Sequence, residues 1–309
     1  PPRARPRSDD RSAMLQRSVL GRLTVLDFVL LALIAAAIGW LWYRVETQLV
    51  YTWNWGIIPE YFLFWDEQAG TWRTNMLLEG LVTTIRMTLW ASVLSLVVGT
   101  VVAVARISTW PSLRWLARTY VELVRNIPPL IFIFIFYFFL SGPVTELLGV
   151  SDWARGLDGW REAVVTVLFG PTNLFANFVT GTVCLALFEA AYVAEIIRAG
   201  IANIPKGQWE AANALGLSRW RTLRLVVLPQ AVVRILPPLT GQMISLIKDS
   251  SMVSLISVQE LTFSGQQISV ATRKVFEIWL TVAALYFVLC FTLSTVSRGL
   301  ERRMGRAGH

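Results

Sequence analysis

The sequence predicts an all-α integral membrane protein, because its apolar residues form runs too long for the core helices of a soluble domain. Of the 309 residues, 55% are hydrophobic and only 16% are charged, whereas about a quarter of a soluble domain is charged. Six runs are long enough, or nearly so, to cross a hydrocarbon core about 30 Å thick. They lie near residues 24–43, 78–105, 120–140, 175–197, 232–247 with its continuation, and 275–296.

The first apolar run follows a polar lead over residues 1–23 that contains six arginines. It lacks the short apolar segment and small-residue cleavage site of a removed signal peptide. We therefore expect residues 24–77 to supply an additional membrane helix and a Trp-rich loop. The loops at 45–76 and 141–174 are expected to be ordered caps.

The positions of Lys and Arg predict the direction of the spans, because these residues are in excess in cytoplasmic loops. Nineteen of the 28 Lys and Arg residues fall on one side of a six-span alternation, so both termini are expected in the cytoplasm. The net charge of +8 does not indicate nucleic-acid binding, because the basic clusters sit at the ends of apolar runs. The opposite side includes an expected aromatic belt of Trp53, Trp55, Trp65 and Trp72.

Cysteine and histidine give no sign of a metal site or of catalysis. Cys184 and Cys290 lie inside apolar runs and are expected to act as small buried hydrophobic residues. The only histidine, His309, is at the carboxyl end. The sequence therefore offers neither a metal-ligand cluster nor a pair of nucleophile and histidine.

Residues 204–230, IPKGQWEAANALGLSRWRTLRLVVLPQ, predict a short helix, a tight corner and a second, basic helix. Pro205 suits the first turn of the first helix, Gly216 can end it in a left-handed conformation, and Ser218 can cap the second. Trp209, Ala212 and Leu215 or Gly216 fall on one helical face. One interpretation is an amphipathic loop on the bilayer surface.

The other interpretation is a docking helix, because small side chains let a partner surface approach closely. These small residues are Ala211, Ala212, Ala214 and Gly216. A docking helix on a membrane protein predicts a partner on the same side of the membrane.

The order Glu210-Ala211-Ala212, Gly216, Val226-x-Leu228-Pro229 resembles the EAA signature of ABC importer permeases, with Val226 in place of the usual isoleucine. Four further stretches are similar to the polar amino-acid branch of that family: AYVAEIIRAGIANIPKGQ at 191–208, LPPL at 236–239, ISLIKDSS at 244–251 and LERRM at 300–304. The resemblance covers about residues 80–304, so the first span lies outside the five-helix type I core.

The resemblance implies a permease domain over residues 78–304, with a coupling helix at 205–217 and a tail at 305–309. In the family this helix sits in a groove of a cytoplasmic ATPase. The residues expected to make that contact are Trp209, Glu210, Ala211, Ala212, Leu215 and Gly216.

The resemblance also implies partners: a cytoplasmic ABC ATPase dimer, a second identical or related permease subunit, and an extracytoplasmic binding protein that delivers an amino acid. The location implied is the bacterial cytoplasmic (inner) membrane, with several spans in the lipid bilayer. The chain has no G-x-x-x-x-G-K-[ST] phosphate loop. We therefore expect no ATPase activity in this chain, with ATP and Mg²⁺ bound by the partner ATPase subunits.

Glu189 is the first candidate for solute binding, because a charged group inside a membrane is costly and by default functional. It lies about 14 residues into the fourth span, roughly 20 Å along a helix, and Tyr192 can share its face. Family members more often carry a small or uncharged residue at this position. Glu189 either contacts a cationic or amino group of the solute, or is a protonated acid hydrogen-bonded between helices. By contrast, Glu122 with Arg125 and Glu195 with Arg198 are expected to form local helix-end ion pairs.

The second candidate is the segment Lys248-Asp249-Ser250-Ser251, which separates apolar runs that are each short for a full span. Pro237 and Pro238 predict a further break upstream. Broken helices at membrane depth line cavities and mark midplane sites in transporters. In the family this stretch lines the translocation path, so Asp249, Ser250 and Ser251 are expected to meet the solute; alternatively, Lys248 neutralises Asp249 locally.

Two other classes of function remain open from the residues alone. An ion-coupled secondary amino-acid transporter would also hold acids at a broken helix, but it would transport without an ATPase. A non-transporting membrane scaffold or sensor would leave Glu189 and Asp249 without a purpose.

Overall fold

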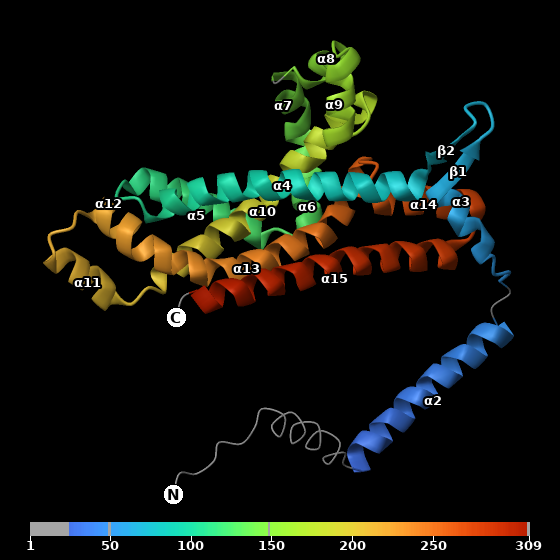
Figure 1. Ribbon diagram of the computed structural model, residues 1–309, viewed down its shortest axis with the longest axis horizontal. Coiled ribbons are helices and arrows are strands. Elements are labelled where there is room, and N and C mark those ends of the chain that lie inside the picture. The colour runs from blue at the N-terminus through green and yellow to red at the C-terminus, as the bar shows by residue number, and fades with distance from the viewer. Residues whose placement is uncertain (1–24, 49–50, 148, 308–309) are drawn as a thin grey trace, which may run out of the picture. The chain divides into compact units, whose positions relative to one another are not determined.

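The structure is a computed structural model that describes residues 25–48, 51–147 and 149–307 (Figure 1). The polar lead at 1–23 and His309 lie outside these residues. The chain forms two compact units, Pro1–Trp53 and Asn54–His309. The first contains α2 (Val25–Gln48), an apolar helix long enough to cross a membrane whose described side chains are exposed except for Asp27.

Among the described residues, five helical segments are long and apolar enough to cross a membrane, or six if one bent pair counts as a span. The first four are α2, α4 (Met76–Ile107), α10 (Phe175–Ala202) with the preceding turn η3 (Thr172–Leu174), and the run from α12 to η5. The fifth is α15 (Val275–Ala307). The prediction of an all-α membrane fold is confirmed.

The bent pair lies where the sequence predicted one span at 120–140. It consists of α5 (Pro111–Asn126) and α6 (Pro129–Ile135) with its π-helical continuation η2 (Phe136–Ser141), and the two parts meet at 116°. Ile127 is extended because it precedes Pro128, and a residue before proline is disfavoured in the α conformation. The span predicted at 120–140 is therefore present as this bent pair, the possible sixth span among the described residues.

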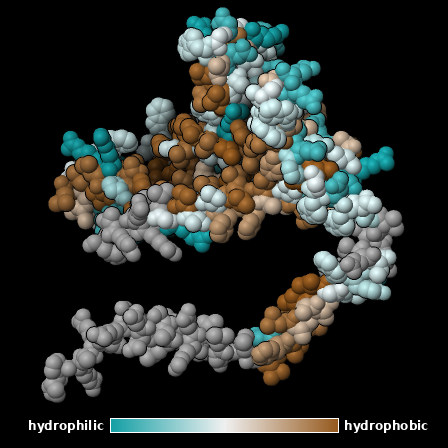
Figure 2. Space-filling view, turned by 45° about the vertical axis from the view of Figure 1, so that its right-hand side comes forward, coloured by the Kyte–Doolittle hydropathy of each residue, from teal (hydrophilic) through white to brown (hydrophobic). Residues whose placement is uncertain are grey.

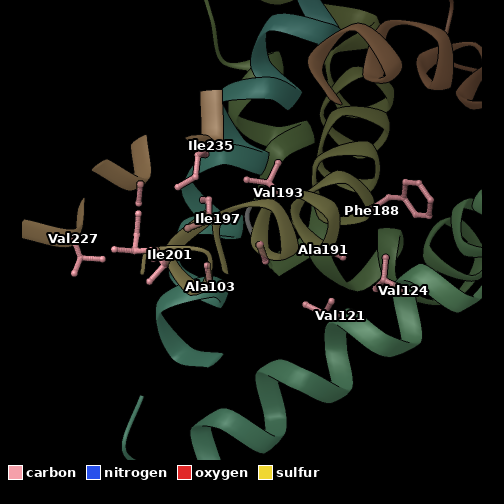
Figure 3. Close-up of a cluster of buried hydrophobic side chains, with 13 residues drawn as sticks. Ala103, Val121, Val124, Phe188, Ala191, Val193, Ile197, Ile201, Val227 and Ile235 are labelled. Carbon is pink, nitrogen blue, oxygen red and sulfur yellow. The ribbon is translucent and has the colours of Figure 1, made fainter. Parts of the chain in front are cut away.

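The centre of the second unit is the contact between α4 and α10. Gly99 of α4 permits a close approach, because a Cβ atom there would lie 2.6 Å from Val193 Cγ1 and 2.9 Å from the Ala190 carbonyl oxygen. Beside it, α5, α10 and α13 bury a hydrophobic cluster that includes Val121, Phe188, Ile197 and Ile235 (Figure 3). Small and β-branched residues thus let three helices meet around α10.

The two ends of the second unit carry different structures (Figure 1). At the hairpin end, η1 (Trp55–Ile57) and α3 (Ile58–Phe62) lead into an antiparallel hairpin of β1 (Leu63–Asp66) and β2 (Thr71–Thr74). Trp65 pairs with Trp72 across the strands, and their rings lie 5.6 Å apart. The sequence predicted an ordered cap here but no strands. The aromatic belt stays a prediction; its four tryptophans are exposed.

The cap at 141–174 is a cluster of short helices, α7 (Gly142–Leu147), α8 (Val150–Arg155) and α9 (Gly159–Phe169). Trp90 of α4 attaches it to the bundle, because its indole nitrogen donates to the Leu168 carbonyl at 3.1 Å and its ring stacks on Phe169. Figure 2 shows hydrophilic residues at the tip of this cluster and hydrophobic residues over the bundle. The predicted cap is therefore ordered and helical.

The other end, here called the α11 end, contains α11 (Lys206–Ala214), α12 (Arg219–Thr222) and the π-helical η4 (Leu223–Val227), which leads into α13 (Leu228–Asp249). Pro237 and Pro238 lie inside α13 without ending it, so the predicted upstream break is wrong. Membrane helices tolerate proline when their neighbours satisfy the freed backbone groups. The predicted break at Lys248 is a change of helix type, from α13 to the 3-10 helix η5 (Ser250–Ile256).

A buried polar joint holds α14 (Leu261–Thr272) between α4 and α15. Glu260 caps α14 by accepting from the Phe263 amide at 2.9 Å, and it also accepts from Tyr286 at 2.6 Å and Thr84 at 3.3 Å. Because its partners come from three helices, this fully buried carboxyl links them.

Candidate functional site

The structure places Glu189 at the contact between α10 and α13. Its side chain is fully buried, and its Oε2 accepts a hydrogen bond from Gln242 Nε2 at 2.6 Å. Its other oxygen, Oε1, is buried and has no hydrogen-bond donor in the described part of the chain. A buried carboxyl oxygen without a donor is costly, which favours a ligand that supplies one.

Asp249 lies beside Glu189, although 60 residues separate them in the sequence. The two carboxyl groups approach within hydrogen-bonding range. Two ionised carboxylates cannot donate to each other. Among the described residues, Gln242 donates a side-chain hydrogen bond to this pair, here called the acid pair, and the charge of Lys248 acts on Asp249. Tyr192, one turn after Glu189, lies within the electrostatic field of both acids.

The two serines of the same segment occupy different surroundings. Ser250 is buried, and its hydroxyl donates to the Ile247 carbonyl at 2.7 Å. Ser251 donates to the Lys248 carbonyl at 2.7 Å and, with Lys248, lines a separate cavity of about 340 Å³ against α15. Lys248 makes no ion pair with Asp249 within the described residues, although its charge still acts on that carboxylate.

A cluster of arginines surrounds Glu195, two turns further along α10. Arg198 contacts both oxygens of Glu195, and Arg106 of α4 donates to one of them. The predicted Glu195–Arg198 pair is thus present as part of a larger network. Together with residues of α5, these groups line a polar cavity of about 470 Å³.

Arg125 differs from the expected arrangement. Glu122 pairs with Arg118 at 3.1 Å, not with Arg125. The guanidinium of Arg125 instead lies over the ring of Tyr192, 5.5 Å from its centroid, and 4.0 Å from Glu195. The prediction of a Glu122–Arg125 pair is wrong, because the tertiary contact with α10 draws Arg125 away from its own helix.

At the α11 end, the predicted helix, corner and second helix are confirmed. Gly216 has a φ of +72°, and α11 ends in a Schellman motif, with Leu217 N donating to Ala212 O and Gly216 N to Asn213 O. Ser218 precedes α12 in an extended conformation, without a side-chain capping bond. Only glycine adopts such a positive φ at little cost, which explains the sharp corner.

The face of α11 that contains Trp209 and Ala212 is turned toward the chain's own bundle. Ala212 is buried, and Trp209 packs partly against the cluster of α5, α10 and α13. Leu215, which was expected on the same face, is 80% exposed. The exposed residues of the predicted docking set are therefore Glu210, Ala211, Leu215 and Gly216.

Gln242 and Arg125 belong to the site but were not predicted from the sequence. Gln242 is uncharged, so the high cost of burying a charge did not identify it as a site residue. It lies seven residues before Asp249 and hence on the same face of α13. Arg125 was assigned to the wrong partner. No group of three or more His, Cys, Asp and Glu side chains suited to a metal occurs among the residues that the structure describes.

The helical spans, the buried acid pair and the exposed α11 corner define a multi-pass membrane protein of the transport type. Residues 95–306 match the family described as binding-protein-dependent transport system inner membrane component. This chain belongs to that family and is a multi-pass protein of the inner membrane. The family gives no support to the secondary-transporter or scaffold alternatives.

Similar proteins carry the same type of domain. The chain is 36% identical over 233 residues to the glutamine transport system permease protein GlnP of Escherichia coli (strain K12), covering 74% of this chain and 93% of that one. It is 35% identical over 245 residues to the L-cystine transport system permease protein TcyB of Bacillus subtilis (strain 168), covering 78% and 92%.

The solved structure of an amino acid ABC transporter with histidines is similar at a TM-score of 0.63 and 28% identity, covering 82% of this chain and 100% of that one. The MetNI methionine ABC transporter shares the fold at a TM-score of 0.55 and 21% identity. The fold therefore recurs over nearly the whole length of these relatives.

Proposed function

We propose that this chain is the membrane-spanning subunit through which an ATP-driven importer moves an amino acid across the bacterial cytoplasmic membrane. The observation that carries this proposal is the acid pair of Glu189 and Asp249, held between α10 and α13 with one buried oxygen that lacks a donor. An ammonium or other cationic group supplies both the charge and the hydrogen-bond donors that the pair lacks. The relatives' names, which include permeases for glutamine, glutamate or aspartate and cystine, support an amino acid as the solute.

We also assign Tyr192 and Ser250 to the proposed solute site, and Ser251, which lines the separate cavity against α15, to the path that leads to it. The serine hydroxyls already donate to backbone carbonyls, so they are left to accept hydrogen bonds from an ammonium. Tyr192 lies in the electrostatic field of the acids, and its phenol can accept or donate a hydrogen bond. The proposed site therefore favours a cationic group.

The proposed coupling to ATP hydrolysis is mechanical and occurs at α11. Glu210, Ala211, Leu215 and Gly216 form the exposed surface for a cytoplasmic ABC ATPase, while Trp209 and Ala212 hold α11 to the bundle. ATP and Mg²⁺ belong to the partner ATPase dimer, since this chain has no phosphate loop. A second permease subunit and an extracytoplasmic binding protein complete the importer.

The test is solute-stimulated ATP hydrolysis and uptake by the complete transporter in proteoliposomes. Asp249→Asn should abolish or sharply reduce both while the complex still assembles, and Glu189→Gln should alter the preference between basic and neutral amino acids. Asp152→Asn, an exposed change on α8, is the matched control.

Three results would contradict parts of the proposal. Wild-type uptake by Asp249→Asn would remove Asp249 from the solute site, and unchanged preference in Glu189→Gln would return Glu189 to a structural role. Uptake by this chain alone, sensitive to uncouplers and independent of ATP, would overturn the ATP-driven mechanism itself.

A further inference from the structure

Arg125 has hydrogen-bonding capacity that the protein does not use. In the described part of the chain its guanidinium makes no hydrogen bond, and its one ion pair, to Glu195, is 4.0 Å long. Both oxygens of Glu195 are already occupied by closer partners, Arg198 and Arg106. A guanidinium has five donors arranged to bind a carboxylate in two places, so Arg125 is poised for an additional anion.

The cavity beside Arg125 favours such an anion. It has a volume of about 470 Å³ and is lined by three arginines and two glutamates, which leaves one positive charge uncompensated. Arg125 is 42% exposed within the chain, whereas Arg106 is 12% exposed and committed to Glu195. Arg198 is 35% exposed but bonds to both oxygens of Glu195, so Arg125 is the most exposed and least engaged of the three arginines.

Tyr192 is close to both this positive group and the acid pair. The hydroxyl of Tyr192 lies in the electrostatic field of Arg125, Glu189 and Asp249 at once, and Arg125 lies over its ring. Tyr192 thus adjoins a basic group and a pair of acids. Glu189 and Tyr192 are three residues apart, which is about 4.5 Å along a helix.

We propose that Arg125 binds the carboxylate of the transported amino acid, while the acid pair binds the cation of its side chain. The inference rests on the proposed function, because it assigns the carboxylate-binding part of the same solute site. It specifies a basic amino acid such as lysine, ornithine or arginine, in which the side-chain cation lies several bonds from the carboxylate. An amine of the same shape without the carboxylate binds more weakly.

The experiment compares L-arginine with L-argininamide, which replaces the carboxylate by a neutral amide. Binding is measured by calorimetry to the assembled transporter in nanodiscs, without the extracytoplasmic binding protein, so that only the permease's own site is measured. We expect wild type to prefer arginine by about 10- to 100-fold, the typical size of a charged hydrogen-bonded contact. Arg125→Gln should reduce this ratio to near one and leave argininamide affinity unchanged.

Arg118→Gln is the matched control, because Arg118 lies on the same helix, pairs with Glu122 and does not line the cavity. It should keep the wild-type ratio. If Arg125→Gln keeps the wild-type ratio, or Arg118→Gln lowers it equally, the inference is wrong. If Arg125→Gln does not assemble, Arg125→Lys decides: a reduced ratio supports the assignment, and the wild-type ratio overturns it.

The failure of this inference is distinct from the failure of the proposed function. A wild-type transporter that binds arginine and argininamide equally overturns the role of Arg125 alone. A wild-type transporter that binds neither compound contradicts the cationic solute site as well.

Discussion

Glu195 is the carboxylate shared by arginines from three helices, so its removal should destabilise the permease far more than removal of an exposed acid. The perturbation is Glu195→Ala, which leaves Arg198, Arg106 and Arg125 without their shared carboxylate. Removing one partner of a fully buried ion pair costs about 3–5 kcal/mol, whereas exposed pairs contribute about 0–1 kcal/mol.

The exposures place Glu195 between these limits. Its side chain is 23% exposed, and its partners Arg106 and Arg198 are 12% and 35% exposed. We therefore expect Glu195→Ala to lower the free energy of unfolding by about 2–3 kcal/mol. Glu122→Ala is the matched control, because that glutamate is 53% exposed and pairs with an arginine that is 69% exposed; its expected cost is about 0.5 kcal/mol or less.

The assay is equilibrium unfolding of the purified permease in mixed micelles, followed by helicity. Both substitutions introduce alanine into a helix, so propensity effects cancel in the comparison. Equal losses in the two variants, or a loss in Glu195→Ala below about 1 kcal/mol, would refute the assignment of Glu195 as the anchor of the network.

Three further predictions concern coupling, packing and the buried joint. Glu210→Lys at the exposed surface of α11 should uncouple transport from ATP hydrolysis without preventing membrane insertion, and normal uptake by this variant would exclude the docking role. Gly99→Ala should cost about 1–3 kcal/mol in unfolding experiments, because its Cβ would overlap α10, whereas Gly241→Ala, which meets nothing within 4 Å, should be neutral or stabilising. Glu260→Ala should lower the free energy of unfolding by about 2–3 kcal/mol because three donors lose their acceptor, and Glu260→Gln should retain most of the stability. Equal melting temperatures of wild type, Glu260→Ala and Glu260→Gln would contradict the role of Glu260 in linking the three helices.

Local patterns were sufficient to predict the spans and the α11 corner. Hydrophobic length determines where a helix crosses a bilayer, and a glycine at the end of a helix determines where the chain turns left-handed. Gly216 alone was therefore sufficient to predict the left-handed end of α11. The hairpin of β1 and β2 could not be predicted in this way, because the contact of Trp65 with Trp72 exists only once the strands are paired.

The site could be predicted in part, for a physical reason. Glu189 and Asp249 stood out because each is a charge placed in an apolar run, but Gln242 is neutral and its contact with Glu189 spans 53 residues. Arg125 was ambiguous because Glu122 has an arginine both four residues before it and three residues after it, and both spacings suit a helix. Only the packing of α5 against α10 decides between them.

The connection of the acid pair to α11 gives the proposed coupling a structural route. Glu189 lies on α10, which three residues separate from α11, and Asp249 lies on α13, which follows α11 through α12 and η4. Gln230 of α13 donates to Gln208 of α11 at 3.0 Å, and Arg234 of α13 donates to the carbonyl of Asn203 at the α10–α11 joint. In the proposed importer, a partner that moves α11 therefore pulls on both helices that hold the acids. If α10 and α13 move by different amounts, we expect the relative position of the two carboxyl groups to change, and with it the affinity of the proposed site for a cation.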